Sequence, residues 1–406
     1  MKKYKLGNIL TISSTSITPQ AGRTYHLYSL PSFDNGKIPE ITKGENIQSN
    51  KYVVSNRCIL FNKLNVRFKR IWRIENNAPN KLCSTEFLPL IIDESIIDYQ
   101  YCYYLLASDD LTNYLCGINS NTSGSHKRIN PDILLDLEVT LPVLDEQKRI
   151  GSILANLDRK IALNRSINHN LEAMAKQLYD YWFVQFDFPD ENGKPYKSSG
   201  GKMVWNEKLK REIPVGWSDG QLSGIANIIM GQSPDGSSYN EVGNGKIFYQ
   251  GSTDFGIRFP SIRQYTTAPT RFAKKRDILM SVRAPVGATN IANNDCCIGR
   301  GLAALNSKVG SITHLYYIID GLKTAFDQRN AAGTTFGSIT KDDLFVLPVV
   351  VPNTAVLLSF EKVCSAFFEK QMIIGEEIDL LTKLRDSLLP LLMNGQVSVN
   401  YDLSND

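Results

Sequence analysis

One stretch of the sequence occurs twice, and this repeat constrains the fold more than any other feature. Residues 129–142 read INPDILLDLEVTLP and residues 339–352 read ITKDDLFVLPVVVP, with a constant separation of 210 positions. The same separation holds forward through residue 182. A chain of 406 residues is also too long for one ordinary core. We therefore expect two domains of similar build.

Upstream of this motif the two copies drift apart, as insertions would make them. Three further matches have larger separations. Tyr103–Tyr104 matches Tyr316–Tyr317 at a separation of 213 positions, Cys83 matches Cys297 at 214 positions, and RCIL (57–60) matches RDIL (276–279) at 219 positions. Each copy is therefore expected to be a head of variable detail, followed by a segment that tolerates no change in length. A fixed length indicates a helix whose length determines the positions of the parts that it connects.

That segment carries apolar residues at alternating intervals of four and three, and we call these positions the seam. In the first copy they are Ile150, Leu154, Leu157, Ile161, Asn164, Asn168, Leu171, Ala175, Leu178 and Trp182. In the second copy they are Phe360, Cys364, Phe367, Gln371, Ile374, Ile378, Leu381, Arg385, Leu388 and Leu392. This spacing is typical of a coiled coil rather than of a helix lying on a globular core.

Each seam has two polar interruptions, Asn164 and Asn168 in the first and Gln371 and Arg385 in the second. A buried polar residue at such a position costs stability and fixes register or partner. Two helices paired with each other in a fixed alignment are therefore predicted. The alternative is a pair of amphipathic helices that pack on separate cores.

At 1.5 Å per residue, each seam helix would be about 50 Å long. Antiparallel pairing would then hold the two heads about that far apart. The predicted fold is α+β, with two mixed α/β heads, two long antiparallel coiled-coil helices and a pseudo-twofold internal repeat. The expected boundaries are a first head at 1–144, a helix at 145–185, a connector at 186–215, a second head at 216–353, a helix at 354–395 and a tail at 396–406. Trp205 and Trp217 are expected to anchor the connector.

Composition excludes several classes of protein. No apolar run reaches the roughly 18–20 residues of a membrane helix, and the first residues lack the apolar core of a secretory signal. We therefore expect a cytoplasmic protein without a membrane contact. The seven cysteines include no C-x-x-C pair, so reduced core thiols are expected and a protein-built zinc site is not. The net charge of +4 permits nucleic-acid binding without requiring it.

Each head carries a run of basic residues with aromatic or apolar residues between them. In the first head Arg57 is followed by the candidate DNA-binding residues Lys63, Arg67, Lys69, Arg70 and Arg73. In the second head the candidates are Arg258, Arg263, Arg271, Lys274, Lys275, Arg276 and Arg283. Phosphates require such cations, and arginine also reads guanine edges. The alternative is a solvated face of a sheet.

A polar loop opens each head, SSTSITPQAGRT at 13–24 and GQSPDGSSYN at 231–240. Gln232 and Ser233 in the second loop are candidates for reaching base edges, although such loops are also ordinary turns.

A catalytic alternative rests on Pro131–Asp132 followed by Glu146 and Lys148, which fit the loose PD…ExK pattern of a magnesium-dependent nuclease. Asn130 and Pro131 equally suit the first turn of a helix, where an acid is favourable. In the second copy the Glu-x-Lys positions hold Val356, Leu357 and Leu358. The feature that the two copies share is therefore the capped first turn of a helix and not the metal-binding pattern. A free-standing nuclease and a coiled-coil scaffold that binds proteins are the two alternatives to DNA reading.

Several stretches resemble the specificity subunits of bacterial type I restriction-modification enzymes over essentially the whole chain. They are LPVLDEQKRIGSILANLDRKI (141–161), the connector FDFPDENGKPYKSSGGKMVWNEKLKREIPVGW (186–217), GQSP (231–234), RDILMSVRAPVG (276–287) and SLLPLLMNGQV (387–397). The resemblance implies two target-recognition domains that each read one half of a split, asymmetric sequence in double-stranded DNA, joined by two antiparallel spacer helices.

The resemblance further implies partners. Two modification subunits would dock on the helices, bind S-adenosylmethionine and methylate adenine, and a restriction subunit would use ATP and Mg²⁺ within the complex. The chain itself would then be no enzyme and bind none of these cofactors. Glu146 and Gln147, which precede the first helix in the family-like motif, are the candidate docking residues. The second copy departs from this pattern, with Val356 and Leu357 in their places.

Overall fold

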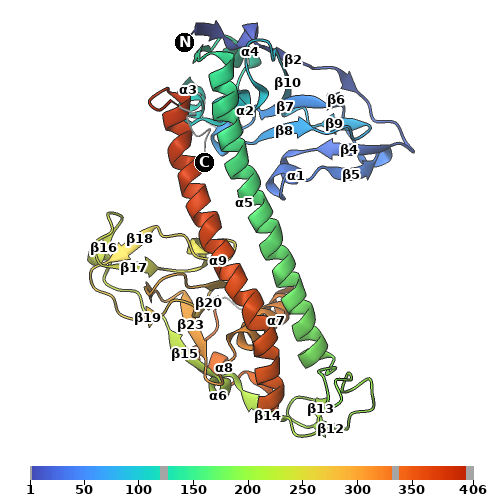
Figure 1. Cartoon of the computed structure of the whole chain (residues 1–406), viewed down its shortest axis with the longest axis vertical. Coiled ribbons are helices and arrows are strands. Elements are labelled where there is room, and N and C mark those ends of the chain that lie inside the picture. The colour runs from blue at the N-terminus through green and yellow to red at the C-terminus, as the bar shows by residue number, and fades with distance from the viewer. Residues whose placement is uncertain (1, 119–126, 332–337, 399–406) are drawn as a thin grey trace, which may run out of the picture. The chain divides into compact units, whose positions relative to one another are not determined.

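Figure 1 shows a computed structural model of the chain, in which residues 2–118, 127–331 and 338–398 are described. The chain divides into two compact units. Unit 1 comprises residues 1–162 and 380–406, and unit 2 comprises residues 163–379. Each unit contains one mixed α/β head and a part of each of two long helices, α5 (Leu144–Tyr179) and α9 (Thr354–Met393).

The described residues of the head of unit 1 form three sheets. β1 (Lys2–Lys5) pairs with β11 (Glu138–Leu141), and a four-stranded antiparallel sheet has the order β2 (Leu10–Ile12), β10 (Phe87–Ile92), β7 (Arg57–Asn62), β8 (Ile71–Glu75). A five-stranded sheet has the order β3 (Ser16–Ile17), β6 (Lys51–Val53), β9 (Lys81–Cys83), β4 (Thr24–Tyr28), β5 (Glu40–Lys43), and β4 runs parallel to β9. The predicted basic hairpin is β7–β8.

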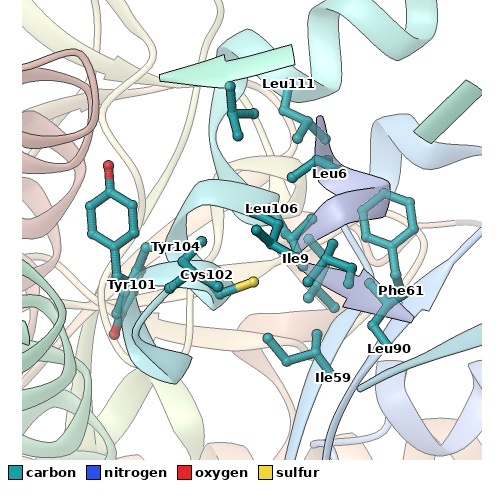
Figure 2. Packing of buried hydrophobic residues seen from close by; sticks show 14 of the residues in the cluster. Leu6, Ile9, Ile59, Phe61, Leu90, Tyr101, Cys102, Tyr104, Leu106 and Leu111 are labelled. Carbon is teal, nitrogen blue, oxygen red and sulfur yellow. The ribbon is translucent and has the colours of Figure 1, made fainter. Parts of the chain in front are cut away.

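The core of unit 1 lies between the four-stranded sheet and the helices. α2 (Tyr99–Ala107) contributes Tyr101, Cys102 and Leu106 to this core. Figure 2 shows Cys102 and Leu106 on the side of α2 that faces Ile59 and Leu90 of the sheet, and Tyr101 on the other side. α3 (Asp109–Ile118) and α4 (Pro131–Leu135) add further apolar residues. The same core includes residues of both long helices, namely Ile150, Leu154, Ala155 and Leu392.

Outside the undescribed residues 332–337, the head of unit 2 also contains three sheets. β14 (Ser218–Gln221) pairs with β24 (Pro348–Val351), and a four-stranded sheet has the order β15 (Ala226–Met230), β23 (Leu302–Ser307), β20 (Ile278–Ser281), β21 (Thr289–Ile291). A five-stranded sheet has the order β16 (Tyr239–Asn240), β18 (Gln264–Thr266), β17 (Lys246–Tyr249), β22 (Cys296–Ile298), β19 (Phe272–Ala273), with β17 parallel to β22. Its helices are α6 (Leu222–Ile225), α7 (Ile312–Ala331) and α8 (Lys341–Phe345).

The sequence repeat is a repeat of connectivity. β1 and β11 correspond to β14 and β24, the four-stranded sheets correspond strand by strand, and β6-β9-β4-β5 corresponds to β19-β22-β17-β18. α4 and α8 are separated by 210 positions, as are β11 and β24. The heads differ in a fifth strand, which is β3 beside β6 in the first head and β16 beside β18 in the second.

One match predicted from the sequence is wrong by a single position. The amide of Ser84 bonds to the carbonyl of Tyr28, and the amide of Gly299 bonds in the same way to the carbonyl of Tyr249. Ser84 therefore corresponds to Gly299 at a separation of 215, and Cys83 corresponds to Ile298 rather than to Cys297. A shift of one residue moves a strand's side chains to the other face, so hydrogen bonds locate the equivalence better than residue identity does.

The long helices begin close to the predicted residues, and α5 is followed by a short π-helical stretch at Asp180–Val184. Every seam side chain is buried or half-buried. In unit 2, Asn164 donates to Glu377 at 2.9 Å and Gln371 donates to Glu172 at 2.8 Å. In unit 1, Arg385 bonds to Asp158 at 2.9 Å. Within unit 2, the α5 residues Asn164, Asn168 and Glu172 contact Glu377 and Gln371 of α9, so rising numbers on α5 meet falling numbers on α9.

The connector forms a hairpin of β12 (Met203–Asn206) and β13 (Arg211–Pro214). Trp217 is buried against Phe183, Phe186 and Phe188 in an aromatic cluster that also contains Phe360 of α9. Trp205 is 54% exposed. Trp217 thus anchors the connector as expected, and the expectation for Trp205 is wrong because more than half of its side chain is exposed, and the neighbouring Val204 is partly exposed as well.

All seven cysteines are free thiols, and all except Cys116 are buried. Burial raises the pKa of Cys58, Cys296 and Cys364 to about 12. These side chains are core residues, as the sequence predicts.

Candidate nucleic-acid interface

The structure separates the predicted DNA-binding cations of the first head into paired and unpaired ones. Lys69 is paired with Asp109, and Arg70 forms two hydrogen bonds of 2.7 Å with Asp34. These bonds hold the pKa of Asp34 below its usual value. Lys63 is half-buried and Arg67 is exposed, and neither forms an ion pair with a described residue. Lys63 and Arg67 are therefore the cations of this run that are available to a phosphate.

Arg73 has a different environment. Its guanidinium lies 4.6 Å from the ring centre of Tyr103 and 5.9 Å from that of Tyr104, both on α2. The hydroxyl of Tyr104 donates to Asp158 of α5 at 2.6 Å, and Asp158 also accepts from Arg385. Arg73 thus belongs to a contact between the head of unit 1 and the parts of the long helices in the same unit.

In unit 2, three predicted cations bind the long helices. Lys275 is paired with Glu376 at 2.7 Å, and Arg276 forms two hydrogen bonds with Glu369. Arg258, whose side chain is only 10% exposed, pairs with Glu172 of α5 at 3.1 Å. These side chains hold the second head against α5 and α9. The sequence could not distinguish them from DNA-binding residues because charge alone does not show which partner it has.

Arg258 takes part in a network like that of Arg73. It lies over the rings of Tyr316 and Phe368, and Glu172 also accepts from Gln371 of α9. Burial and the nearby Glu172 raise the pKa of Tyr317, which follows Tyr316 on α7. In each unit, therefore, a Tyr-Tyr pair of the head, a carboxylate of α5 and a polar side chain of α9 come together.

The remaining cations of the second head are more accessible. Arg263 is paired with Asp254 but keeps 58% of its side chain exposed. Arg271, Lys274 and Arg283 are exposed and form no ion pair with a described residue.

Arg271 and Arg283 lie near Gln232 and Ser233 of the polar loop, and we call this group the strand-end cluster, together with Arg300. The carbonyl of Ile298 accepts from the amide of Gln232, and the amide of Ile298 donates to the carbonyl of Arg271. The amide of Val282, next to Arg283, bonds to the carbonyl of Gly301. These backbone bonds place the residues of the strand-end cluster at one end of β20 and β22.

Arg300 was not among the sequence-derived candidates. Its amide donates to the hydroxyl of Ser233 at 3.3 Å, and its side chain is exposed. It stands between Gly299 and Gly301, where a Cβ atom would come within 3.0 Å and 2.8 Å of Gln250. The Gly-Arg-Gly sequence was the available signal, because glycines on both sides of a lone cation permit such a close approach.

The candidate docking pair is corrected by the structure. Gln147 is 1% exposed, donates to the carbonyls of Ile96 and Pro142, and accepts from the amide of Asp98. Its side chain is therefore an internal link between the start of α5 and the start of α2, and a partner cannot reach it. Glu146 is half-buried. Burial of Tyr101, together with the nearby charge of Glu146, raises the pKa of Tyr101 to about 12.

Asp132 occupies the capped turn that the sequence predicts. Asn130 accepts from the amide of Asp132 at 3.1 Å, and Pro131 lies in the first turn of α4. Over residues 2–118, 127–331 and 338–398, no three His, Cys, Asp or Glu side chains are grouped so that they could hold a metal ion.

The sequence matches a known family along most of its length. The family model described as the type I restriction modification DNA specificity domain matches residues 1–173 and 214–363, and thus covers both heads. The chain belongs to this family. It is a specificity subunit of a type I restriction-modification system, which confirms the resemblance seen in the sequence.

Two relatives cover nearly the same length as this specificity subunit. The putative type I restriction enzyme MjaX specificity subunit of Methanocaldococcus jannaschii is 29% identical over 97% of this chain and 93% of its own length. The type I restriction enzyme HindI specificity subunit of Haemophilus influenzae is 23% identical over 86% of this chain and 88% of its own.

A solved structure supports the fold. The type I restriction-modification S subunit from M. genitalium aligns over 97% of this chain and 96% of its own, with a TM-score of 0.61 and 16% identity. Among the described helices of this specificity subunit, none combines the length and apolar character needed to cross a bilayer.

Proposed function

We propose that the two heads of this specificity subunit each read one half of a bipartite, asymmetric target in double-stranded DNA. The observation that carries this proposal is that the heads repeat one connectivity but expose different side chains. The first head exposes Arg67 and Phe68, whereas the second exposes the strand-end cluster. Two scaffolds of one kind with unlike exposed chemistry fit two half-sites of unlike sequence.

The strand-end cluster has the chemistry for reading bases. An arginine fork matches the two acceptors of guanine in the major groove, and a glutamine amide matches the acceptor and donor of adenine. Gln232, Arg271, Arg283 and Arg300 are proposed to contact the second half-site, with Lys274 on phosphates. In the first head, Lys63 and Arg67 are proposed to contact DNA. The paired residues Arg258, Lys275 and Arg276 are proposed to orient the head instead.

The long helices are proposed to form an antiparallel coiled coil that serves as a spacer, and the two copies to be related by a pseudo-twofold axis. The buried seam and the polar contacts of Asn164 and Gln371 support this arrangement. A helix of about 50 Å corresponds to about 15 base pairs at 3.4 Å each. Half-site centres are therefore expected one to one and a half DNA turns apart, or less if the duplex bends.

The helices of the specificity subunit are further proposed to bind two modification subunits. Restriction subunits would join through the complex so formed. The outer faces of α5 and α9 carry exposed apolar residues at matching positions of the repeat. Leu163 and Ile373 are 55% and 58% exposed, and Met174 and Leu384 are 52% and 44% exposed. Two equivalent apolar positions on each helix suit two copies of one partner. Glu146 remains a candidate contact at the start of α5.

We also propose that this chain is no enzyme by itself and acts in the cytoplasm. S-adenosylmethionine, ATP and Mg²⁺ would then be bound by the partner subunits. The nuclease alternative is less well supported, because Asp132 serves the cap of α4 and the second copy has Val356 and Leu358 where the first has Glu146 and Lys148. Cleavage of DNA by the purified chain with Mg²⁺, abolished by Asp132→Ala, would establish that alternative.

Methylome sequencing of cells that carry this specificity subunit with its modification partner tests the proposal directly. The expected result is one methylated sequence with two unlike halves and a fixed gap of unread bases. A single continuous or palindromic site would contradict it. The third possibility, a protein-binding scaffold, predicts no sequence-specific methylation and no steep loss of DNA binding with rising salt.

A further inference from the structure

The first head exposes a large aromatic side chain at the tip of its basic hairpin. Phe68 is 51% exposed and is the last residue of a single 3₁₀ turn, Val66–Phe68, between β7 and β8. An aromatic ring left in water gives up the free energy of its burial. A single exposed ring is common on protein surfaces, so the surroundings of Phe68 decide whether it has a use.

The turn that presents Phe68 is held by many hydrogen bonds. The amide of Phe68 bonds to the carbonyl of Asn65, and the amide of Asn65 bonds to the carbonyl of Lys127 at 2.8 Å. Asn65 and Lys69, on either side of the turn, have positive φ angles of 52° and 46°. The ring is therefore carried by an ordered turn, so that inserting it into a partner would cost little conformational entropy.

Two guanidinium groups lie against the ring of Phe68. The Cζ atom of Arg67 is 4.7 Å from the ring centre, and that of Arg70 is 4.9 Å away. Arg70 is fixed by its two hydrogen bonds to Asp34, whereas Arg67 is exposed and forms no ion pair with a described residue. Arg67 is thus free to leave the ring for a phosphate, which would uncover an aromatic face. A polyanion fits these surroundings better than an apolar protein surface does.

We propose that Phe68 is a wedge that stacks on a base and unstacks one base-pair step in the half-site read by the first head. Apolar side chains that enter between bases kink duplex DNA in this way, and neighbouring cations hold the backbone beside the opened step. The corresponding turn of the second head, residues 284–288, reads APVGA and has no aromatic side chain. The second head exposes Phe272 by 50%, but that ring lies on β19 and not on this turn, so unstacking by the hairpin turn is confined to one half-site. This inference rests on the proposed reading of a bipartite target.

The test uses the full-length chain without modification subunits, because methyltransferases themselves turn bases out of the duplex. The probe is a duplex of the methylated target with 2-aminopurine placed in turn at each position of both half-sites. Fluorescence should rise at a step in one half-site only. Phe68→Ala should abolish the rise and weaken binding about tenfold, the scale of one lost base–aromatic stack. Phe68→Trp should retain the rise.

Trp205→Ala is the matched control, because Trp205 is a similarly exposed aromatic on the connector hairpin, and it should leave the signal unchanged. Urea unfolding of each variant shows whether the first head remains folded. A rise that persists in a folded Phe68→Ala variant overturns the proposal, as does a rise in both half-sites or in neither. A wild-type chain that binds target and random duplex equally would overturn the proposed function instead. A separate assay measures binding of the modification subunit to the same variant. If Phe68→Ala binds DNA normally but no longer binds that subunit, the ring contacts protein and not bases, and the proposal is overturned.

Discussion

The hydroxyl of Tyr104 donates to the carboxylate of Asp158 at 2.6 Å, and the same carboxylate binds Arg385 at 2.9 Å. Tyr104 lies on α2, Asp158 on α5 and Arg385 on α9, so one carboxylate connects a head to two helices within unit 1. Both charged side chains are about three-quarters buried, with exposures of 25% and 27%. This contact is a direct attachment of the recognition domain to the helices.

Removing this attachment should destabilise unit 1. Tyr104→Phe loses a hydrogen bond to a charged acceptor and should lower the free energy of unfolding by about 1–2 kcal/mol. Asp158→Ala should cost more, since it leaves both Tyr104 and Arg385 without this partner. The measurement is urea unfolding. Asp386→Ala is the control, because Asp386 also binds Arg385 but is 59% exposed. If Asp386→Ala lowered the free energy of unfolding as much as Asp158→Ala does, the contact of Asp158 would stabilise unit 1 no more than an exposed ion pair.

Lengthening one helix should disturb target spacing. Four residues inserted after Asn164 in α5 would move Asn168 and Glu172 away from Gln371 while α9 keeps its length. The expected outcome is a changed gap between the half-sites or the loss of methylation, with both heads still folded by circular dichroism. The methylated sequence of cells carrying the variant gives the answer. An unchanged gap at full activity would mean that the helices do not set the spacing.

The stability of unit 2 should fall in mild acid because of His314. This side chain is buried beside the rings of Tyr179 and Phe183, and burial lowers the pKa of His314 to about 3. The unfolded chain takes up the proton near pH 6.5, whereas the folded chain does not until about pH 3. The neutral His314 side chain therefore costs no stability above pH 6.5. Below this pH the free energy of unfolding declines by at most about 1.4 kcal/mol per pH unit.

His314→Phe should remove this contribution. The variant should gain stability relative to the wild type as the pH is lowered from 7.5 to 5, as followed by urea unfolding at each pH. A difference between the two proteins that stays constant over this range would show that His314 titrates normally in the folded chain.

Arg300 should matter for DNA binding more than the ion-paired Arg276 does. Arg300→Ala should weaken binding about tenfold or more if the guanidinium reads a base, with relaxed specificity at one position of the second half-site. If the guanidinium contacts a phosphate, the loss of affinity should be the same for all DNA sequences. The slope of log affinity against log salt concentration should then be shallower by about one ion. Fluorescence anisotropy at several salt concentrations separates these cases. Arg276→Ala, which breaks a pair with Glu369, should leave the salt dependence unchanged.

The exposed apolar pairs on the helices should matter for partner docking. Leu163→Asp should weaken the association of one modification subunit, Ile373→Asp should weaken that of the other, and the double variant should lose both. The stoichiometry of the purified complex, measured by native mass spectrometry, tests this expectation. Leu163→Ser and Ile373→Ser, which add no charge, should have smaller effects. Two modification subunits retained by the double aspartate variant would place docking elsewhere.

The sequence predicted the repeat, the long helices and the capped turn at Asn130, because these depend on local spacing. It did not predict the roles of Arg258, Lys275 and Arg276, because their glutamate partners lie far along the chain. Gln147 was misread for the same reason, since a glutamine beside a helix start looks exposed until Ile96 and Asp98 are placed around it. Arg300 was missed because a single arginine outside the basic run adds nothing to a count of charges.

The core of unit 1 contains Leu392 as well as Leu6 and Ile9, so its two ends in the sequence are almost as far apart as the chain allows. On the ribosome, the head that is synthesised first must wait for α9, which is synthesised last, before its packing is complete. A nonsense mutation at residue 380 would thus spare the later head, whose residues end before it, and leave the earlier one exposed to chaperones and proteases.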